Sequence, residues 1–370
     1  AAAGGAGGAG LDITDVFSTY LYDGTGAAHT ITNGIDLAGE GGLTWIKTRN
    51  TASSAWHSLS DTERGAGYIV RSDTTGGQNY DTAEFTSFNS NGFTVGSDDQ
   101  TNGSGRTYAS WTFRKAPKFF TCLTYSGTGD TTTQTISHDL GAVPGCIIVK
   151  RTDSSDSWRV YHRGVDVNGD GQPWTDMLTL NTTAAASDYP VWGDTAPTST
   201  QFTVGYESSV NASGGTYVAY LFAHNDNGDG EFGPDSDQDI IKCGSASATG
   251  LTTVNLGFEP QFVLIKSASI INSWHIFDSM RGFTADSGAE ILHPNLADAE
   301  YTGTADICNL TSTGFTFNSS RFNGSGTYIY MAIRRGPLAP PTAGTEVFDV
   351  AAGLSGSTLP SYNSNFPVDM

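Results

Sequence analysis

Oxygen-bearing side chains at alternate positions form the sharpest chemical motif in the sequence. The stretch DVNGDG at residues 166–171 matches the first half of a calcium-binding loop, in which alternate oxygen ligands wrap a hard cation and glycine permits the turn. The bidentate glutamate expected at the twelfth position is missing, because Met177 stands there. The motif therefore predicts either a Ca²⁺ site at Asp166, Asn168 and Asp170 or a solvated Asx-Gly turn. Ca²⁺ is the only cofactor that the sequence suggests.

Aromatic residues in the same region form a second candidate site. Trp174, Tyr189 and Trp192 lie among polar residues and could stack on sugar rings, with core packing as the alternative for each of them. Catalytic patterns are missing from the sequence, since the histidines are scattered without HxH or HExxH spacing and no GxSxG elbow occurs. We therefore expect no enzyme. A glycan depolymerase stays as a remote alternative, because a glycosidase needs only two well-placed carboxylates.

A longer phrase is written three times along the chain. In each copy an apolar run ends in lysine, a polar loop follows, a tryptophan opens a second short run, and an Arg-Gly pair closes it. Such a pattern predicts a β-hairpin. What three copies share is expected to be scaffold, so these residues are predicted to be structural. They are Lys47, Lys150 and Lys266, then Trp56, Trp158 and Trp274, and finally Arg64, Arg163 and Arg281.

The shared arginines are expected to make structural hydrogen bonds at a strand end. Asp61 and Asp278 lie three residues before Arg64 and Arg281 and are candidates to pair with them. Val160 stands at the same distance in the second copy, which weakens the pairing as a general rule.

A second shared block, centred on a Thr-Tyr pair, closes each unit. The pairs recur at a spacing of about 110 residues, and a chain of that size is large enough to enclose its own core. The stretches between the shared blocks, residues 66–85, 165–189 and 283–307, diverge among the copies. We therefore expect them on loops outside the shared core, where binding residues usually lie.

The predicted fold is all-β, with three tandem antiparallel β-sandwich domains of jelly-roll or lectin-like type and the start of a fourth. Glycine, serine and threonine are abundant, and the aromatic fraction is 11%, which suits short strands and tight turns. The predicted organisation is a Gly/Ala-rich linker (1–10), a first repeat (11–117), a second repeat (118–224), an acidic linker (225–239), a third repeat (240–337), and a linker with a partial fourth repeat (338–370).

Charge and composition exclude several classes of partner. The net charge is −20, so no basic stripe exists to displace counterions from a nucleic acid. No run of 18 apolar residues occurs in the sequence, which predicts that the chain does not insert into a membrane. The four cysteines do not recur at matching repeat positions and are expected to be buried free thiols.

The repeated phrases resemble a known family. GGLTWIKTRN, TSFNSNGFTVGS and TYASWTFRKAP in the first copy, with VPGCIIVKRT and TYVAYLFAH in the second, are similar to a tandem-repeat domain of predicted tail-fibre and virion structural proteins of marine tailed bacteriophages, cyanophages especially. The resemblance covers residues 11–370 and implies a virion component without assigned catalytic residues. It also implies other virion proteins as partners and a homo-oligomeric assembly.

Two functions from different classes follow. The first is a non-enzymatic structural protein on the surface of a virion, forming part of a tail fibre, neck or other appendage and contacting the host surface. The second is a carbohydrate-binding module or adhesin whose divergent loops bind a host surface glycan.

Overall fold

The computed structural model describes residues 10–52, 55–129, 133–285, 289–302 and 307–336. With 42% strand and 7% helix, the protein is all-β, and every strand pair in the described ranges is antiparallel. The prediction of an all-β sandwich fold is therefore confirmed. The predicted partial fourth repeat (338–370), and the linker 1–10 apart from Gly10, lie outside the described residues.

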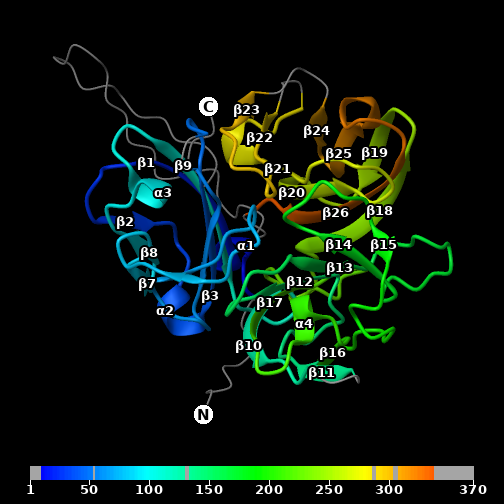
Figure 1. Ribbon diagram of the computed structural model, residues 1–370. Coiled ribbons are helices and arrows are strands. Elements are labelled where there is room, and N and C mark those ends of the chain that lie inside the picture. Colours follow the sequence, from blue (N-terminus) through cyan, green and yellow to red (C-terminus); the bar gives the residue numbers. More distant parts are fainter. Residues whose placement is uncertain (1–9, 53–54, 130–132, 286–288, 303–306, 337–370) are drawn as a thin grey trace.

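The first repeat consists of short helices and strands in an order that the other two repeats follow (Figure 1). Its helices are α1 (Ile13–Val16), α2 (Leu37–Glu40) and α3 (Asp99–Asn102). Its strands are β1 (Phe17–Asp23), β2 (His29–Thr32), β3 (Gly42–Thr48), β4 (Ser58–Asp61), β5 (Tyr68–Ile69), β6 (Asn79–Tyr80), β7 (Ser87–Asn89), β8 (Gly92–Val95) and β9 (Thr107–Arg114).

The second and third repeats repeat this order with small changes. The second contains β10 (Phe120–Ser126), β11 (Gln134–Ser137), β12 (Cys146–Arg151), β13 (Arg159–His162), β14 (Asp176–Thr179), β15 (Ser187–Asp188), β16 (Gln201–Val204), α4 (Ser208–Asn211) and β17 (Thr216–Phe222). The third contains β18 (Ile241–Ala248), β19 (Leu251–Asn255), β20 (Pro260–Ser267), β21 (His275–Asp278), β22 (Glu290–Ile291), β23 (Tyr301–Thr302), β24 (Cys308–Thr311), β25 (Gly314–Asn318) and β26 (Gly326–Arg334), with 3₁₀ turns η1 (Ser279–Arg281) and η2 (Ser319–Arg321).

Each repeat is a sandwich of an inner and an outer sheet. The inner sheets have the strand orders β1-β9-β3-β4, β10-β17-β12-β13 and β18-β26-β20-β21, and the second is extended by β14 and β15. The outer sheets are β2-β8-β7, β11-β16 and β19-β25-β24. The closing strand of each repeat thus lies between its opening strand and the strand that carries the shared lysine. This equivalent topology is the structural counterpart of the repeated phrases.

The tyrosine of each Thr-Tyr pair locks the turn that precedes the closing strand. The Tyr108 hydroxyl donates to the Asp99 carbonyl at 2.7 Å and accepts from the Gly103 N–H at 2.7 Å. The Tyr217 hydroxyl makes the matching pair of bonds at α4, both at 2.6 Å. A turn without a regular partner strand leaves backbone groups unpaired, and a phenol that both donates and accepts satisfies two of them.

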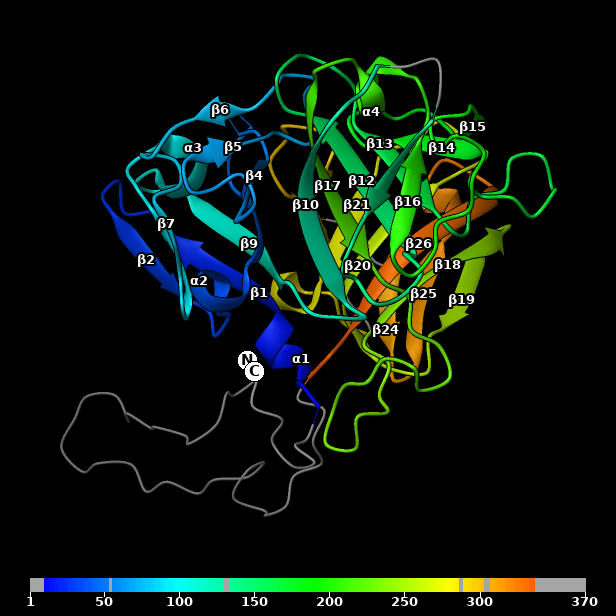
Figure 2. The same cartoon turned by 90° about the horizontal axis from the view of Figure 1, so that it is seen from below.

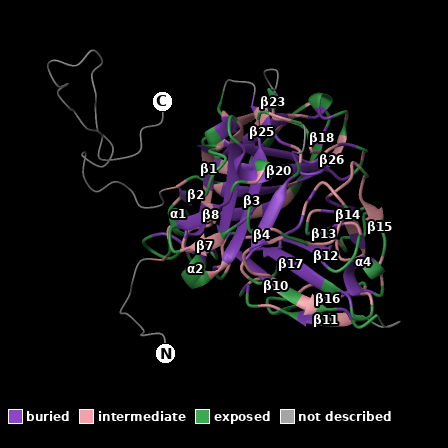
Figure 3. Ribbon diagram, turned by 60° about the vertical axis from the view of Figure 1, so that its left-hand side comes forward, coloured by how far each residue is buried: buried purple, intermediate pink, exposed green. Residues whose placement is uncertain are grey.

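The central strands of the inner sheets are buried on both faces. All seven residues of β3 are buried, and the inner strands are largely purple in Figure 3. Side chains alternate across a strand, so Ile46 packs toward the outer sheet of the first repeat while Leu43 and Trp45 belong to the central cluster. Coverage on both faces explains why the run before each shared lysine is apolar at successive positions.

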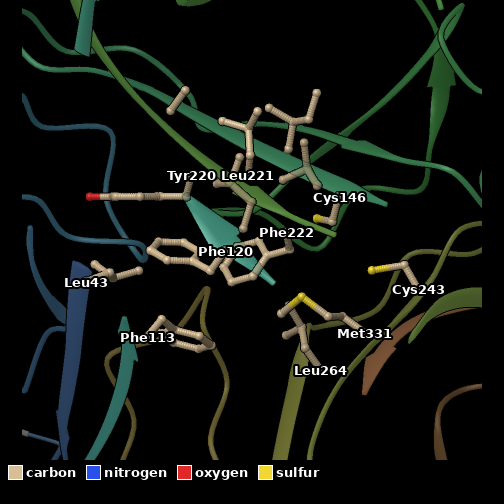
Figure 4. Close-up of a cluster of buried hydrophobic side chains, with 14 of the residues drawn as sticks. Leu43, Phe113, Phe120, Cys146, Tyr220, Leu221, Phe222, Cys243, Leu264 and Met331 are labelled. Atoms are coloured by element: carbon tan, nitrogen blue, oxygen red, sulfur yellow. The ribbon is translucent and has the colours of Figure 1, made fainter. Parts of the chain in front are cut away.

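The largest hydrophobic cluster is shared by the three repeats. Figure 4 shows side chains of all of them converging, among them Phe113 from the first, Phe222 from the second and Leu264 from the third. The ring centroids of Phe113 and Phe222 lie 5.4 Å apart, and those of Phe113 and Phe262 lie 6.1 Å apart. The first and third repeats also have clusters of their own between their two sheets. The expectation that each repeat encloses a separate core therefore needs correction, because one face of every inner sheet is covered by the other repeats.

The shared lysines close a ring of contacts between the repeats. Each has no solvent exposure, and burial lowers the pKa of each to about 8. Each ammonium donates to a carbonyl of its own repeat and to one of another repeat. The contacts between repeats are Lys47 to the Asp298 carbonyl (2.7 Å), Lys150 to the Thr75 carbonyl (2.9 Å) and Lys266 to the Thr183 carbonyl (3.5 Å). The first repeat thus binds the third, the second binds the first, and the third binds the second.

The divergent stretches supply these carbonyls, which changes the role predicted for them. Thr75 belongs to residues 66–85, Thr183 to 165–189 and Asp298 to 283–307. They were expected on peripheral loops, but they run along the junctions between repeats. A backbone carbonyl is an acceptor whatever the side chain, so the contact survives divergence of the sequence.

The acidic segment 225–239 is also packed rather than being a simple linker. Asn225 is buried. Its side-chain Oδ1 accepts from the backbone N–H groups of Ile240 and Ile241, and its side-chain Nδ2 donates to the Lys118 carbonyl at 2.8 Å. The Gly233 N–H donates to the Leu11 carbonyl at 3.0 Å. Figure 2 shows this segment as a yellow-green loop near α1.

Candidate functional site

A second ring of contacts shows which residues are equivalent in the three hairpins. The strand pairings place Ile46 opposite Ser58, Val149 opposite Arg159 and Ile265 opposite His275. The residues just before these partners are therefore equivalent, namely His57, Trp158 and Trp274. Each meets a backbone carbonyl of another repeat: His57 Nε2 lies 2.9 Å from the His293 carbonyl, Trp158 Nε1 donates to the Arg71 carbonyl (2.9 Å), and Trp274 Nε1 donates to the Thr179 carbonyl (3.0 Å).

The prediction that Trp56 belongs to the repeated scaffold is therefore wrong. His57 takes the place of the buried tryptophan, and its Nδ1 accepts from Trp45 Nε1 at 2.8 Å. Trp56 is 39% exposed and is the only exposed one of the seven tryptophans. The longer loop of the first copy could have indicated this difference. Trp56 follows Lys47 by nine residues, whereas in the second copy Trp158 follows Lys150 by eight.

The shared arginines have two different environments. Arg281 is buried, and its Nε donates to Asp278 at 2.7 Å while its other nitrogens reach Glu300 and the Ile276 carbonyl. Its guanidinium carbon lies 5.3 Å from the centroid of the Trp111 ring, and Trp111 in turn donates to Asp278 at 2.9 Å.

Arg64 makes the corresponding bonds in the first repeat. It pairs with Asp61, which also accepts from the Tyr220 hydroxyl of the second repeat at 2.8 Å. Burial opposes the charge of Arg64, but Asp61 and Tyr220 raise its pKa.

Arg163 departs from the pattern, because its side chain is exposed. The residue equivalent to Asp61 and Asp278 in the strand pairing is His162 and not Val160. His162 Nε2 lies 3.0 Å from the Tyr330 carbonyl, and its Nδ1 accepts from the Gly164 N–H, so the ring continues the contact between repeats without an ion pair. The second repeat therefore keeps the shared arginine without its shared partner.

Replacing Asp278 by alanine is expected to lower the free energy of unfolding by about 3–5 kcal/mol, since the change breaks a buried ion pair with Arg281 and leaves the Trp111 N–H without its acceptor. Chemical denaturation monitored by tryptophan fluorescence measures the change. Glu259→Ala is the matched control, because Glu259 pairs with Arg335 at 2.9 Å on the surface and such pairs contribute about 0–1 kcal/mol. Equal losses in the two variants would contradict the structural role assigned to Asp278.

The candidate calcium loop has the internal hydrogen bonds of an Asx turn. Asp166 accepts from the N–H groups of Asp170 (3.0 Å) and Gly171 (3.3 Å), and Asn168 donates to Asp188 at 2.7 Å. This geometry corresponds to the second of the two alternatives set by the sequence. Within the described ranges, no cluster of three or more His, Cys, Asp or Glu side chains could hold a metal ion.

The three aromatic candidates lie in different environments. Trp192 is buried and packs edge-on against Tyr161, with 6.1 Å between ring centroids, which corresponds to core packing, the second of the two alternatives given for it above. Trp174 is partly buried against the central cluster. Tyr189 is 43% exposed. These residues do not present one aromatic surface to a ligand.

Trp56, Arg71, Glu84 and Gln100 form a candidate binding surface, the Trp56 platform. The Arg71 guanidinium carbon lies 5.1 Å from the centroid of the Trp56 ring. Arg71 is held by Glu84 through bonds of 3.1 and 2.7 Å, and burial raises the pKa of Glu84 against the opposing charge of Arg71. The backbone N–H of Trp56 donates to Gln100 Oε1 at 3.1 Å. Arg71 thus lies against the exposed Trp56 ring, and an aromatic face beside charged groups suits a flat, hydroxylated ligand.

Two further properties bear on where the protein can act. All four cysteines are buried and free, as expected from the sequence, and burial raises the pKa of each thiol. In the part of the chain that the structure describes, no helix has the length and apolar character needed to cross a membrane.

Comparison with known families gives one match. The model of a domain of unknown function, DUF7483, matches residues 12–337. The matched span begins at the cap of α1 and ends after β26, so a single family domain contains all three repeats. No curated protein matches the chain. Since the matched span covers most of the sequence, the chain belongs to the DUF7483 family.

Proposed function

We propose that the protein is a non-enzymatic structural module of a virion appendage, such as a tail fibre or neck, in which it joins other virion proteins and further copies of itself. The observation that carries this proposal is the closed ring of buried contacts among the three repeats. A component that transmits load across a particle benefits from repeats that cannot swing independently. The buried lysines and the shared core supply that rigidity.

The strongly negative net charge of the chain supports the same proposal. The chain has 38 acidic and 18 basic residues, and a net charge far from zero favours solubility of a particle exposed to the medium. The resemblance of the repeated phrases to virion proteins of marine phages points in the same direction.

Immunogold electron microscopy of virions tests the proposal. Antibody raised against the purified protein is expected to label one appendage of the particle at a constant position. Label that is absent from purified virions while the protein remains in the host lysate would contradict a virion role.

A second candidate function is carbohydrate binding, and the exposed Trp56 ring favours it. In the other repeats the strand register places Ser157 and Ser273 at the position of Trp56, so a large aromatic side chain there is not required by the shared scaffold. In this role the platform would stack on a sugar of the host surface, as an adhesin does.

Trp56→Ala is expected to abolish binding on a glycan array while leaving the thermal midpoint within about 1–2 °C, because the ring is outside the core. Tyr206→Ala, which removes another exposed aromatic ring, is the matched control and should leave binding intact. Loss of binding in both variants, or in neither, would argue against the platform.

A further inference from the structure

Arg163 lies at a cavity formed between the second repeat and the acidic segment 225–239. The cavity has a volume of about 380 Å³ and is lined by Lys118, Arg163, His224, Asp226 and Asp229, together with Gly141, Ala142, Val143 and Asn225. This volume lies within the usual range for small-ligand sites. The three basic side chains come from separate segments, namely the joint between the first two repeats, the residue after β13 and the residue that follows β17 by two positions.

The symmetry of the repeats shows that Arg163 is not needed for the fold. In the first and third repeats, the shared arginine is buried against an aspartate. In the second, His162 replaces the aspartate and is engaged with the Tyr330 carbonyl. The guanidinium of Arg163 consequently lies at the exposed side of the strand end. In a chain of net charge −20, a cation without a structural carboxylate partner marks a place where an anion from outside can bind.

His224 adds a neutral donor to the same cavity. Its Nδ1 accepts from the Cys243 N–H at 3.1 Å, so a neutral ring carries its proton on Nε2. Burial lowers the pKa of His224 to about 4, and the nearby charge of Arg163 acts in the same direction. At neutral pH the ring therefore offers an N–H group and no charge.

The acidic groups of the cavity are partly engaged within the protein. Asp226 Oδ1 accepts from Lys242 Nζ at 3.3 Å, and Asp229 Oδ1 accepts from the Asp226 N–H at 2.7 Å. Lys118 is bound to Glu231 at 2.6 Å. The second oxygens of the two aspartates are acceptors that suit hydroxyl groups. Val143, which is 52% exposed, offers an apolar contact at the rim.

We propose that the cavity lined by Arg163, His224 and the two aspartates binds an acidic sugar, with the carboxylate on Arg163 and the hydroxyl groups on Asp226 and Asp229. A simple anion would be repelled by the aspartates, whereas a neutral sugar would leave Arg163 unpaired. A uronate satisfies both sets of groups. The site is independent of the structural role proposed above and of the Trp56 platform, which belongs to the first repeat.

Ligand-observed NMR with the whole protein tests this proposal, using glucuronate, glucose and acetate as probes. Glucuronate is expected to bind at least tenfold more tightly than either of the others. Arg163→Gln should weaken glucuronate binding at least tenfold without changing the thermal midpoint, because the side chain is exposed. Arg321→Gln, which removes a second exposed arginine far along the sequence, is the matched control and should bind glucuronate as the parent does.

A second variant keeps the test independent of Arg163. Val143→Glu adds a negative charge at the exposed rim and is expected to weaken glucuronate binding by a similar factor. Binding of glucose or acetate as tightly as glucuronate would overturn the assignment to an acidic sugar. Failure of glucuronate to bind the parent, or equal binding by the Arg163→Gln and Arg321→Gln variants, would overturn the site itself. None of these outcomes changes what immunogold labelling of virions would show.

Discussion

Residues 11–117, produced alone, are expected to lack a cooperative folding transition. The inner sheet of this repeat buries one face against the other two repeats, through Leu43, Trp45, Trp111 and Phe113. In isolation these side chains would face water, and each large apolar side chain that is fully exposed forfeits about 1.5–3 kcal/mol. The loss over several of them is comparable with the whole stability of a domain, which is about 5–15 kcal/mol.

The isolated repeat would also lose polar contacts that its buried groups need. Lys47 would lack the Asp298 carbonyl, and Trp111 would lack the carboxylate of Asp278. Each of these groups would cost about 1–3 kcal/mol if it stayed buried without a partner. The fragment would therefore either hydrate its inner face or aggregate through it.

Circular dichroism, binding of a hydrophobic dye and calorimetry measure this outcome. The fragment is expected to bind the dye and to show no sharp thermal transition. Residues 11–337, which contain all three repeats, serve as the control and should unfold in a single transition with equal calorimetric and van't Hoff enthalpies. A sharp transition and a near-ultraviolet signal in the fragment would show that one repeat folds alone.

The sandwich architecture could be predicted from the sequence because it depends on local signals. The apolar runs ending in Lys47, Lys150 and Lys266 set the central strands, and the Thr-Tyr pairs mark the turn before each closing strand. Comparison among three copies separated these signals from chance. The shared blocks that close the three units in the sequence contain β9, β17 and β26 for this reason.

The packing of the repeats on one another could not be predicted in the same way. The hydrogen bonds between repeats end on the backbone carbonyls of Arg71, Thr179 and His293. Every residue type has a backbone carbonyl, so the sequence does not mark these acceptors. The stretches that carry these carbonyls diverge, which suggested peripheral loops. Shared apolar faces also look alike in sequence, whether they meet a sheet of the same repeat or of a neighbour.

The candidate sites became visible only when strand register replaced alignment by residue identity. Matching tryptophan to tryptophan placed Trp56 in the scaffold, whereas register assigns that place to His57. Counting back from Arg163 gave Val160, whereas register gives His162. Loops of different length shift such counts by one or two residues, and a shift of one reverses the face of a strand.

Three buried histidines make the folded state sensitive to acid. His57, His162 and His275 lie in the hairpins of the three repeats and are almost fully buried. Burial lowers the pKa of His162 from 6.5 to about 3. Burial also lowers the pKa values of His57 and His275 well below 6.5, helped by the charges of Lys47 and His293 respectively.

The sign of the effect follows from proton binding. The folded state keeps these rings neutral, so unfolding takes up protons as the pH falls from 6.5 toward the folded-state pKa, which is about 3 for His162. The stabilisation is fully present above pH 6.5 and is lost as the pH falls, at about 1.4 kcal/mol per pH unit for each histidine. Asp73, whose pKa burial raises to about 6, and Glu84, whose pKa burial also raises, act in the opposite direction. Burial also lowers the pKa values of His138, His224 and His293 and raises that of Asp176, so six histidines outweigh three carboxyl groups and leave a net loss of stability in acid.

The protein is therefore expected to lose stability steeply between pH 6.5 and pH 4.5, where His162 alone costs about 2.3 kcal/mol. Urea denaturation at a series of pH values measures the slope. His162→Gln keeps an amide donor for the Tyr330 carbonyl but takes up no proton, so its slope should be shallower by about 1.4 kcal/mol per pH unit. Ser137→Gln, which introduces the same side chain on the exposed face of strand β11, should keep the parent slope. If the stability of the parent is constant over this range, or if His162→Gln has the parent slope, protonation of the buried histidines is not the cause of the acid sensitivity.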